Sequence, residues 1–270
     1  MKKLAFVCAV AAMIAATRSA GAADMALKAP LLAAPPPPPV YTWTGCYIGG
    51  NIGLVKQDTG ISDPVGDSLL QPGTTWSNGI GFAAGGQVGC DYQINSNWVV
   101  GVRGMFDSAN ISQSISSVAT DGETFYSAEN FGIKTSWFAT ALARLGYLVV
   151  PDGLVYVKGG AAWKHVSYTD NGYTYAEECG GPEGLCMTFS GAASATILGW
   201  DFGAGFEYAF MPNLSAFVEL DYMGFPSTAT TLTYTTTSHS GGGPPFSTYS
   251  YNYTHDILTV LVGMNLRFHQ

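Results

Sequence analysis

Acidic and basic side chains are spread over seven stretches of this sequence in which apolar residues alternate with small or polar ones, and neither sign of charge dominates. Because successive side chains of a β-strand point to opposite faces, each alternating set belongs to one face of a sheet. Eleven residues form the inward-facing set: Asp91, Arg103, Asp107, Arg144, Lys158, Lys164, Asp201, Glu207, Glu219, Asp221 and Arg267. Held inside a closed sheet, they could line a path for ions or pair with one another. Buried charge is tolerated when it is paired and hydrogen-bonded, so the mixture of signs favours a paired ionic core over an ion path.

The cysteines suggest a second kind of chemistry. Cys8 lies in an apolar N-terminal stretch that we expect to be removed, which leaves Cys46, Cys90, Cys179 and Cys186. An even number in an exported chain favours disulfides. Cys179 and Cys186 flank a short Gly/Pro-rich segment without a nearby His, so we expect them to form a disulfide rather than a metal site. For Cys46 and Cys90 two alternatives stay open: a cross-strand disulfide, or two small thiols on the outward face.

The remaining reactive side chains form no recognisable catalytic constellation. The residues nearest to such a pattern are His165, Ser167 and Asp170, and this spacing is common by chance in a Ser-rich segment. We therefore expect no enzyme, no metal site and no bound cofactor. A haem site built from loop His or Tyr side chains is an open alternative. The tyrosines concerned are Tyr168, Tyr173 and Tyr175, which an aromatic girdle at a membrane interface explains equally well.

The elements that must position these residues are strands. Along Gly199–Tyr208 one alternate set is Gly, Asp and Glu, and the other is apolar with aromatic residues at its ends. Met211–Asn213 then predicts a tight turn, and Leu214–Met223 repeats the alternation. Strands of about ten residues, apolar outside and polar inside, are typical of a transmembrane β-barrel.

Eight stretches carry the alternating pattern. They are approximately Gly45–Val55, Gly79–Gln93, Trp98–Asp107, Thr135–Tyr147, Leu154–His165, Thr196–Ala209, Leu214–Phe225 and Asp256–Phe268. The short connections are Ile94–Asn97, Leu148–Gly153 and Pro212–Asn213. The long ones are Lys56–Asn78, Ser108–Lys134, Val166–Ala195 and Pro226–His255. This predicts an all-β, eight-stranded antiparallel barrel with short periplasmic turns and four long extracellular loops.

The N-terminal residues predict export. Lys2 and Lys3 precede an apolar run, and small residues follow it, so Met1–Ala23 is typical of a signal peptide. The cleavage site lies after Ala22 or Ala23, and the apolar run is short for a membrane anchor. Residues 24–42 are rich in Pro and predict an extended periplasmic linker, either unstructured or a tether to peptidoglycan or a partner. The barrel is expected over residues 43–270.

Composition agrees with an envelope protein. The chain has 34 Gly and 13% aromatic residues, but only 11% charged residues, far fewer than the usual quarter. The net charge is −8, and removal of Lys2, Lys3 and Arg18 with the signal peptide leaves −11. This acidic balance excludes nucleic acid as an expected partner.

Four motifs resemble those of one family. Trp43–Asn51 resembles its opening motif W-x-G-F-Y-x-G-x-x, with Cys46 in place of the usual aromatic. Arg144–Tyr147, Gly203–Tyr208 and Gly263–Phe268 resemble later strands. The chain is thereby similar to the alphaproteobacterial outer-membrane immunogenic or surface-antigen proteins, OmpA-like small β-barrels of the porin family. The resemblance spans Trp43–Phe268.

The resemblance implies a Gram-negative outer-membrane protein with a structural, envelope and surface-antigen role. A narrow diffusion porin and a haem-binding surface receptor are the alternatives. The implied partners are outer-membrane lipid and lipopolysaccharide, a host or surface ligand at the loops, and the barrel-assembly machinery, which reads the last strand. Barrel proteins generally end on the aromatic residue that this machinery reads, whereas His269 and Gln270 follow Phe268 here.

Overall fold

The structure is a computed structural model that describes residues 41–62, 74–120, 125–177, 179, 184–238 and 246–268. These residues belong to one compact unit, residues 39–270. The predicted signal peptide and residues 24–40 of the predicted linker lie outside the described residues. Within the described ranges, no helix is long and apolar enough to span a membrane.

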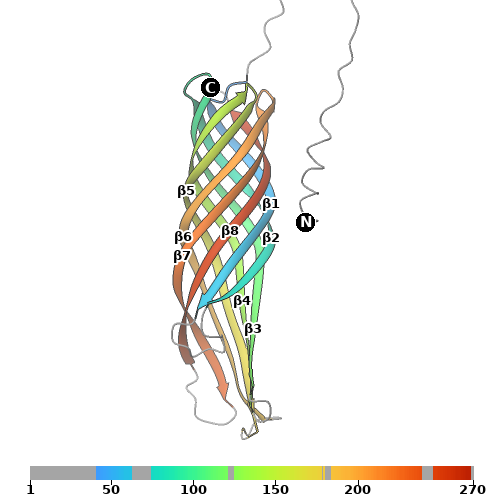
Figure 1. Ribbon diagram of the computed structural model, residues 1–270, viewed down its shortest axis with the longest axis vertical. Coiled ribbons are helices and arrows are strands. Elements are labelled where there is room, and N and C mark those ends of the chain that lie inside the picture. The colour runs from blue at the N-terminus through green and yellow to red at the C-terminus, as the bar shows by residue number, and fades with distance from the viewer. Residues whose placement is uncertain are drawn as a thin grey trace, which may run out of the picture. The chain divides into compact units, whose positions relative to one another are not determined.

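Eight antiparallel strands form a closed barrel (Figure 1). They are β1 (Gly45–Ser62), β2 (Thr74–Gln93), β3 (Trp98–Thr120), β4 (Phe125–Val150), β5 (Gly153–Ala176), β6 (Leu185–Met211), β7 (Leu214–Ser238) and β8 (Phe246–Phe268). Each strand pairs with its neighbours in sequence, and β8 pairs with β1 from Phe268 opposite Cys46 to Asn252 opposite Ser62. The predicted fold class and strand order are confirmed.

The three short connections lie together at one end of the barrel, called here the turn end (top of Figure 1). The β2–β3 turn is closed by a hydrogen bond from Ile94 N to Trp98 O of 2.9 Å. Ala209 N donates to Asp152 O in the β4–β5 turn, and Arg267 N donates to Asn213 O in the β6–β7 turn, both at 2.8 Å. The turns are therefore hydrogen-bonded to neighbouring strands, which fixes the rim of the barrel.

The predicted long loops are wrong in their extent. Most of the residues assigned to them continue the strands away from the turn end. β3 runs to Thr120 instead of Asp107, and β4 begins at Phe125 instead of Thr135. The same extension occurs in β5, β6, β7 and β8, and between Val166 and Ala195 the β5–β6 ladder continues to Tyr175 opposite Leu185. These parts of the strands form the distal extension of the barrel (bottom of Figure 1).

The reason for the error is a reversal of the side-chain pattern. Near the turn end the outward positions are apolar, as at Ile48, Val88 and Val262. In the distal extension the outward positions become polar, as at Ser112 and Ser114, while the residues between them point inward. The sequence prediction looked for strands with apolar outward positions and therefore assigned this stretch to loops. The ladder of backbone hydrogen bonds nevertheless continues through it.

Aromatic side chains form two belts on the outside. At the turn end Trp98 packs edge-on against Tyr147, with ring centroids 5.2 Å apart. At the other edge of the apolar band Phe106 lies 5.5 Å from Trp137, and Trp200 lies 5.5 Å from Tyr222. Between the belts each strand contributes about ten residues, the length a tilted strand needs to cross a bilayer. We call these residues the membrane-spanning segments.

The interior is filled in two layers that reverse the outer pattern. Inside the membrane-spanning segments the side chains are mostly charged or amide-bearing. Beyond them lies an apolar cluster that includes Ile111, Phe131, Phe138, Phe225 and Ile257, all at most 4% exposed. The barrel thus has a polar interior where lipid surrounds it and a largely apolar interior where its outer surface is polar.

This facing assignment predicts that the same substitution has a large effect at one outward site and almost none at another. Val218 lies between the belts, so Val218→Arg is expected to lower the free energy of unfolding by about 2–4 kcal/mol in lipid vesicles. Ser114→Arg in the distal extension is the matched control and should change it by less than about 0.5 kcal/mol. Urea titration of both variants measures the difference. Unchanged stability of Val218→Arg in lipid would contradict the facing of β7.

Candidate functional site: the charged interior of the barrel

All eleven ionisable residues predicted to point inward do lie inside the barrel. Their exposed fractions range from 0% for Asp107, Lys164, Glu207 and Asp221 to 4% for Asp91. They come from every strand except β1. The alternation along each strand is sufficient to bring them together, because closing the sheet directs all the inward faces toward one axis.

Glycines make room for these side chains. Asp91 pairs with Gly101, Asp107 with Gly85, and Asp221 with Gly203 on adjacent strands. A Cβ atom at any of the three glycines would overlap the Oδ1 atom of its aspartate. A narrow barrel interior is just filled by side chains, so a large or charged residue on one strand requires a small one opposite.

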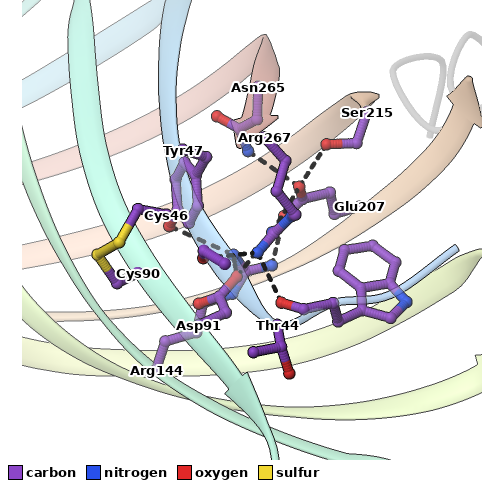
Figure 2. Close-up of polar contacts among 12 residues, drawn as sticks. Thr44, Cys46, Tyr47, Cys90, Asp91, Arg144, Glu207, Ser215, Asn265 and Arg267 are labelled. Atoms are coloured by element: carbon purple, nitrogen blue, oxygen red, sulfur yellow. Dashed lines mark hydrogen bonds and ion pairs between the residues drawn. A yellow bond between two sulfur atoms is a disulfide. The ribbon is translucent and has the colours of Figure 1, made fainter. Parts of the chain in front are cut away.

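A first cluster of charges lies near the turn end (Figure 2). Arg267 donates to Asp91 Oδ2 at 2.8 Å and to the backbone oxygen of Trp43 at 2.7 Å. Arg144 donates to Glu207 Oε2 at 2.5 Å and to Asp91 Oδ2 at 3.3 Å. Two guanidinium groups and two carboxylates therefore form one neutral network with side chains from β2, β4, β6 and β8.

Neutral side chains complete the hydrogen bonding of this cluster. Glu207 Oε1 accepts from Ser215 Oγ at 2.5 Å and from Asn265 Nδ2 at 3.0 Å. Tyr156 presents its ring to Arg144, whose guanidinium carbon lies 3.7 Å from the centroid. Charge-assisted hydrogen bonds of this kind offset the desolvation of a buried ion pair.

The residues just before β1 cover this end of the interior. Trp43 is fully buried, and its indole Nε1 donates to Pro151 O at 3.0 Å in the β4–β5 turn. Tyr41 packs edge-on against it at 4.9 Å and accepts from Arg267 Nε at 3.1 Å. Sequence reasoning assigned Tyr41 to the linker. Its aromatic character and its distance of two residues from Trp43 were the signals that could have placed it in the barrel.

A second cluster lies deeper in the barrel, around Glu219. Arg103 donates to both of its carboxylate oxygens, with the Oε2 contact at 2.6 Å. Lys158 donates to the same carboxylate and lies 2.9 Å from Asp221 Oδ1. Tyr156 OH donates to Glu219 Oε1 at 2.5 Å. Arg103 is on β3 and Glu219 on β7, so this ion pair crosses the lumen between strands on opposite sides of the barrel.

Not all of the eleven inward-facing ionisable residues form ion pairs. Three of them, Asp107, Asp201 and Lys164, form no ion pair within the part of the chain that the structure describes. Asp107 lies beside Asn51, and Asp201 lies near Asp221. Lys164 rests over the ring of Phe225, with Nζ 4.5 Å from the centroid. The cation is thus accommodated by an aromatic face within the apolar layer.

The distal interior contains a polar group that sequence reasoning missed. Tyr168 OH and His255 Nε2 are 2.8 Å apart, and His255 Nδ1 lies 3.1 Å from Thr59 Oγ1. Tyr234 OH donates to Asp170 Oδ2 at 2.5 Å. All were assigned to loops or to a strand end. Their alternation with apolar residues along β5, β7 and β8 was the available signal.

The structure shows the direction of the side chains in two groups of residues raised by the sequence. His165 and Ser167 point outward, whereas Asp170 points inward and is fully buried, so the three do not converge. Tyr168 is 1% exposed and lies inside the barrel, so it belongs to no interface girdle. Tyr173 and Tyr175 do lie outside, with ring centroids 5.3 Å apart, but in the distal extension beyond the aromatic belts.

Both cysteine pairs are joined as disulfides in the structure. Cys46 and Cys90 lie directly opposite each other in the β1–β2 ladder, on the outward face, with Cα atoms 3.9 Å apart. Cys179 and Cys186 have Cα atoms 5.0 Å apart and link the ends of β5 and β6. The first disulfide covalently fixes the register of β1 against β2 close to the residues that contact Arg267.

A family model and two relatives from Brucella agree with this architecture. Residues 6–268 match the sequence model of the family described as outer membrane protein beta-barrel domain. The 31 kDa outer-membrane immunogenic proteins of Brucella melitensis and Brucella suis are each 33% identical over 217 residues, which is 78% of this chain and 82% of theirs. The outer membrane protein OprG from Pseudomonas aeruginosa superimposes with a TM-score of 0.45 and 14% identity, over 84% of this chain and 97% of that chain.

The deeper cluster predicts a large loss of stability when one carboxylate is neutralised. Glu219→Gln leaves the buried guanidinium of Arg103 without a carboxylate partner and Lys158 with Asp221 alone, so we expect a loss of about 3–5 kcal/mol in the free energy of unfolding. Lys56→Ser breaks the exposed pair with Asp58, which spans 2.7 Å, and should cost at most about 1 kcal/mol. Equal losses in the two variants, measured by urea unfolding in detergent, would argue against a stabilising network.

Asp170 predicts a dependence of stability on pH. It lies five residues beyond His165, which is opposite the belt residue Trp137 in the β4–β5 ladder, and therefore outside the membrane-spanning segments. Burial raises its pKa to about 6, although hydrogen bonds with Tyr234 and Glu129 act to lower it. A raised pKa means that the folded barrel holds the proton more tightly than the unfolded chain. Its contribution is therefore present below about pH 4 and is lost as pH rises through about 6, on the order of 2–3 kcal/mol.

Unfolding curves recorded from pH 4 to pH 7 test this dependence. Asp170→Asn keeps the shape of the side chain but cannot titrate, so it lacks the pH-dependent contribution of this carboxyl. Asp58→Asn, on the outer surface, is the control and should retain the full dependence. Burial lowers the pKa of His255, which adds a dependence of the opposite sign, so the sign is read from the difference between the two proteins. The free energy of unfolding of the wild type minus that of Asp170→Asn should fall from pH 4 to pH 7, and a rise would contradict the sign.

Proposed function

Because this chain belongs to the outer membrane protein β-barrel family, we propose that it is a closed, non-conducting surface barrel. It is a protein of the Gram-negative outer membrane. In this proposal the membrane-spanning segments anchor it, and the distal extension projects from the cell. Its role is structural and antigenic, without catalysis.

The observation that carries the proposal is the set of ion pairs inside the lumen. Arg103 on β3 reaches Glu219 on β7 across the lumen, whereas Arg267 on β8 reaches Asp91 on β2 past the intervening strand β1. Trp43 closes the turn end, and the apolar cluster fills the distal interior. An ion entering a narrow diffusion pore of this shape would have to break buried ion pairs and then cross an apolar layer, which is strongly unfavourable.

The distal extension supports a surface role. Its outward side chains are largely Ser, Thr, Asn and Tyr, as at Ser114, Ser116, Asn130 and Tyr173. Such a surface is compatible with water, and the strand ladder holds it at a fixed distance from the membrane. The Brucella relatives carry the name of immunogenic proteins, which agrees with display outside the cell.

Partners follow from the same geometry. The apolar band contacts outer-membrane lipid, including lipopolysaccharide in the outer leaflet. β8 ends on an exposed Phe268, which suits recognition of the last strand by the barrel-assembly machinery. A host or surface ligand would meet the tips of the distal hairpins. The non-catalytic assignment is supported by the opposite facing of His165 and Asp170.

Single-channel recording tests the proposal. Purified monomer refolded into a planar bilayer is expected to show no stable conductance steps, because the lumen is crossed by paired charges. A water-filled porin inserted in the same bilayer shows that the assay detects open barrels. Stable, long-lived channels from the monomer would reject the closed barrel and support the diffusion porin.

A further inference from the structure

Among the residues that the structure describes, one cation on the outer surface has no acidic partner. Lys134 on β4 is exposed and forms no ion pair with any of the residues that the structure describes. Its neighbours across the ladder are Ser112 on β3 and Ser167 on β5. Both carry hydroxyl groups at outward positions. An unpaired ammonium flanked by hydroxyls is suited to an anion with several oxygen atoms.

The depth of this cation in the membrane is set by the aromatic belt. Trp137 lies three residues nearer the turn end on the same strand, and its ring stacks on His165 at 5.8 Å with an interplanar angle of 6°. His165 Nδ1 lies 3.2 Å from Thr196 Oγ1, so Nε2 is the ring nitrogen left for another partner. Belt tryptophans lie at the level of lipid headgroups. Lys134 therefore lies where the headgroup phosphates of the outer leaflet are found.

The opposite side of the barrel at this depth has different charges. Lys56 is paired with Asp58 at 2.7 Å, and Asp58 is opposite Asp256 in the β1–β8 ladder. That face therefore carries an excess of one negative charge, whereas the β3–β5 face carries a lone positive charge. On a chain of net charge −8, an anionic headgroup is attracted to the β3–β5 face and repelled from the β8–β1 face.

We propose that Lys134, His165 and the hydroxyls of Ser112, Ser167 and Thr196 bind the phosphate group of an outer-leaflet glycolipid, with Trp137 packing against its apolar part. The occupant is a phosphate anchored in lipid rather than free phosphate, because the cation lies at the edge of the apolar band and not at the distal tip. The assignment rests on the proposed orientation, with the distal extension outside the cell, and not on whether the barrel conducts.

Native mass spectrometry of the full-length mature protein in nanodiscs tests the site. The nanodiscs contain a bis-phosphorylated lipid A-type glycolipid or its dephosphorylated form. Lys134→Ser should reduce the retained phosphorylated glycolipid about fivefold, and Lys134→Arg should restore it, since one cation near an anionic surface contributes about that factor. Lys56→Ser is the matched control, because it removes an outward cation on the other face, and it should leave retention unchanged. His165→Gln should give a smaller loss.

Three results would overturn the inference. Equal retention by Lys134→Ser and Lys56→Ser would show that the face is not selective. Equal retention of the phosphorylated and dephosphorylated lipids would show that the phosphate does not contribute to binding. Displacement of the glycolipid by millimolar inorganic phosphate would show that the lipid anchor is irrelevant. Circular dichroism of each variant confirms that the barrel is folded before its retention is compared.

Discussion

The contacts of Arg267 join the closing seam of the barrel to its charged interior. This one side chain, on the strand that closes the sheet, pairs with Asp91 on β2, lies 3.8 Å from Glu207 on β6, and donates to backbone oxygens of Trp43 and Gly45. It therefore connects the seam between β1 and β8 to the interior network and to the aromatic residues that cover the turn end. Removing the charge would leave two carboxylates short of a partner in a place without bulk water. The guanidinium suits this position because its fork of donors reaches several acceptors at once.

The bilayer explains why charges gather in this part of the lumen. Outward positions between the aromatic belts must be apolar, so polar residues of these strands can only point inward, where a narrow interior forces them into contact. Glycines such as Gly101 and Gly203 provide the space that the aspartates opposite them require. Beyond the belt the outer surface meets water, and the same strands reverse their pattern, with Ser114 outside and Phe131 inside. One continuous ladder thus carries two opposite patterns, separated by the membrane boundary.

Much of this could be predicted from the sequence, and the limits have physical causes. Alternation alone gave the eight strands, the short turns and the inward set, because a period of two leaves only the choice of face. It could not give the partners of each charge, since Arg103 reaches Glu219 across the lumen only after the stagger of the strands is fixed. The distal extension was misjudged because its pattern is inverted, so Asp170 and His255 were assigned outside the barrel interior. The role of Tyr41 depends on the chain turning back over the lumen, which no local periodicity predicts.

The partners of Arg267 also favour the closed barrel over an open sheet. Arg267 belongs to the last strand, whereas its partners Trp43, Gly45 and Asp91 belong to the first two strands or directly precede them. Their contacts therefore exist only when β8 pairs with β1. In a sheet open between β8 and β1, Arg267 on β8 and Asp91 on β2 would lie six strand spacings apart. Closure therefore adds ion pairs and the packing of Trp43 to the backbone hydrogen bonds of the last ladder. These contacts form together or not at all, which makes closure cooperative and disfavours partly open barrels that would expose a strand edge in lipid.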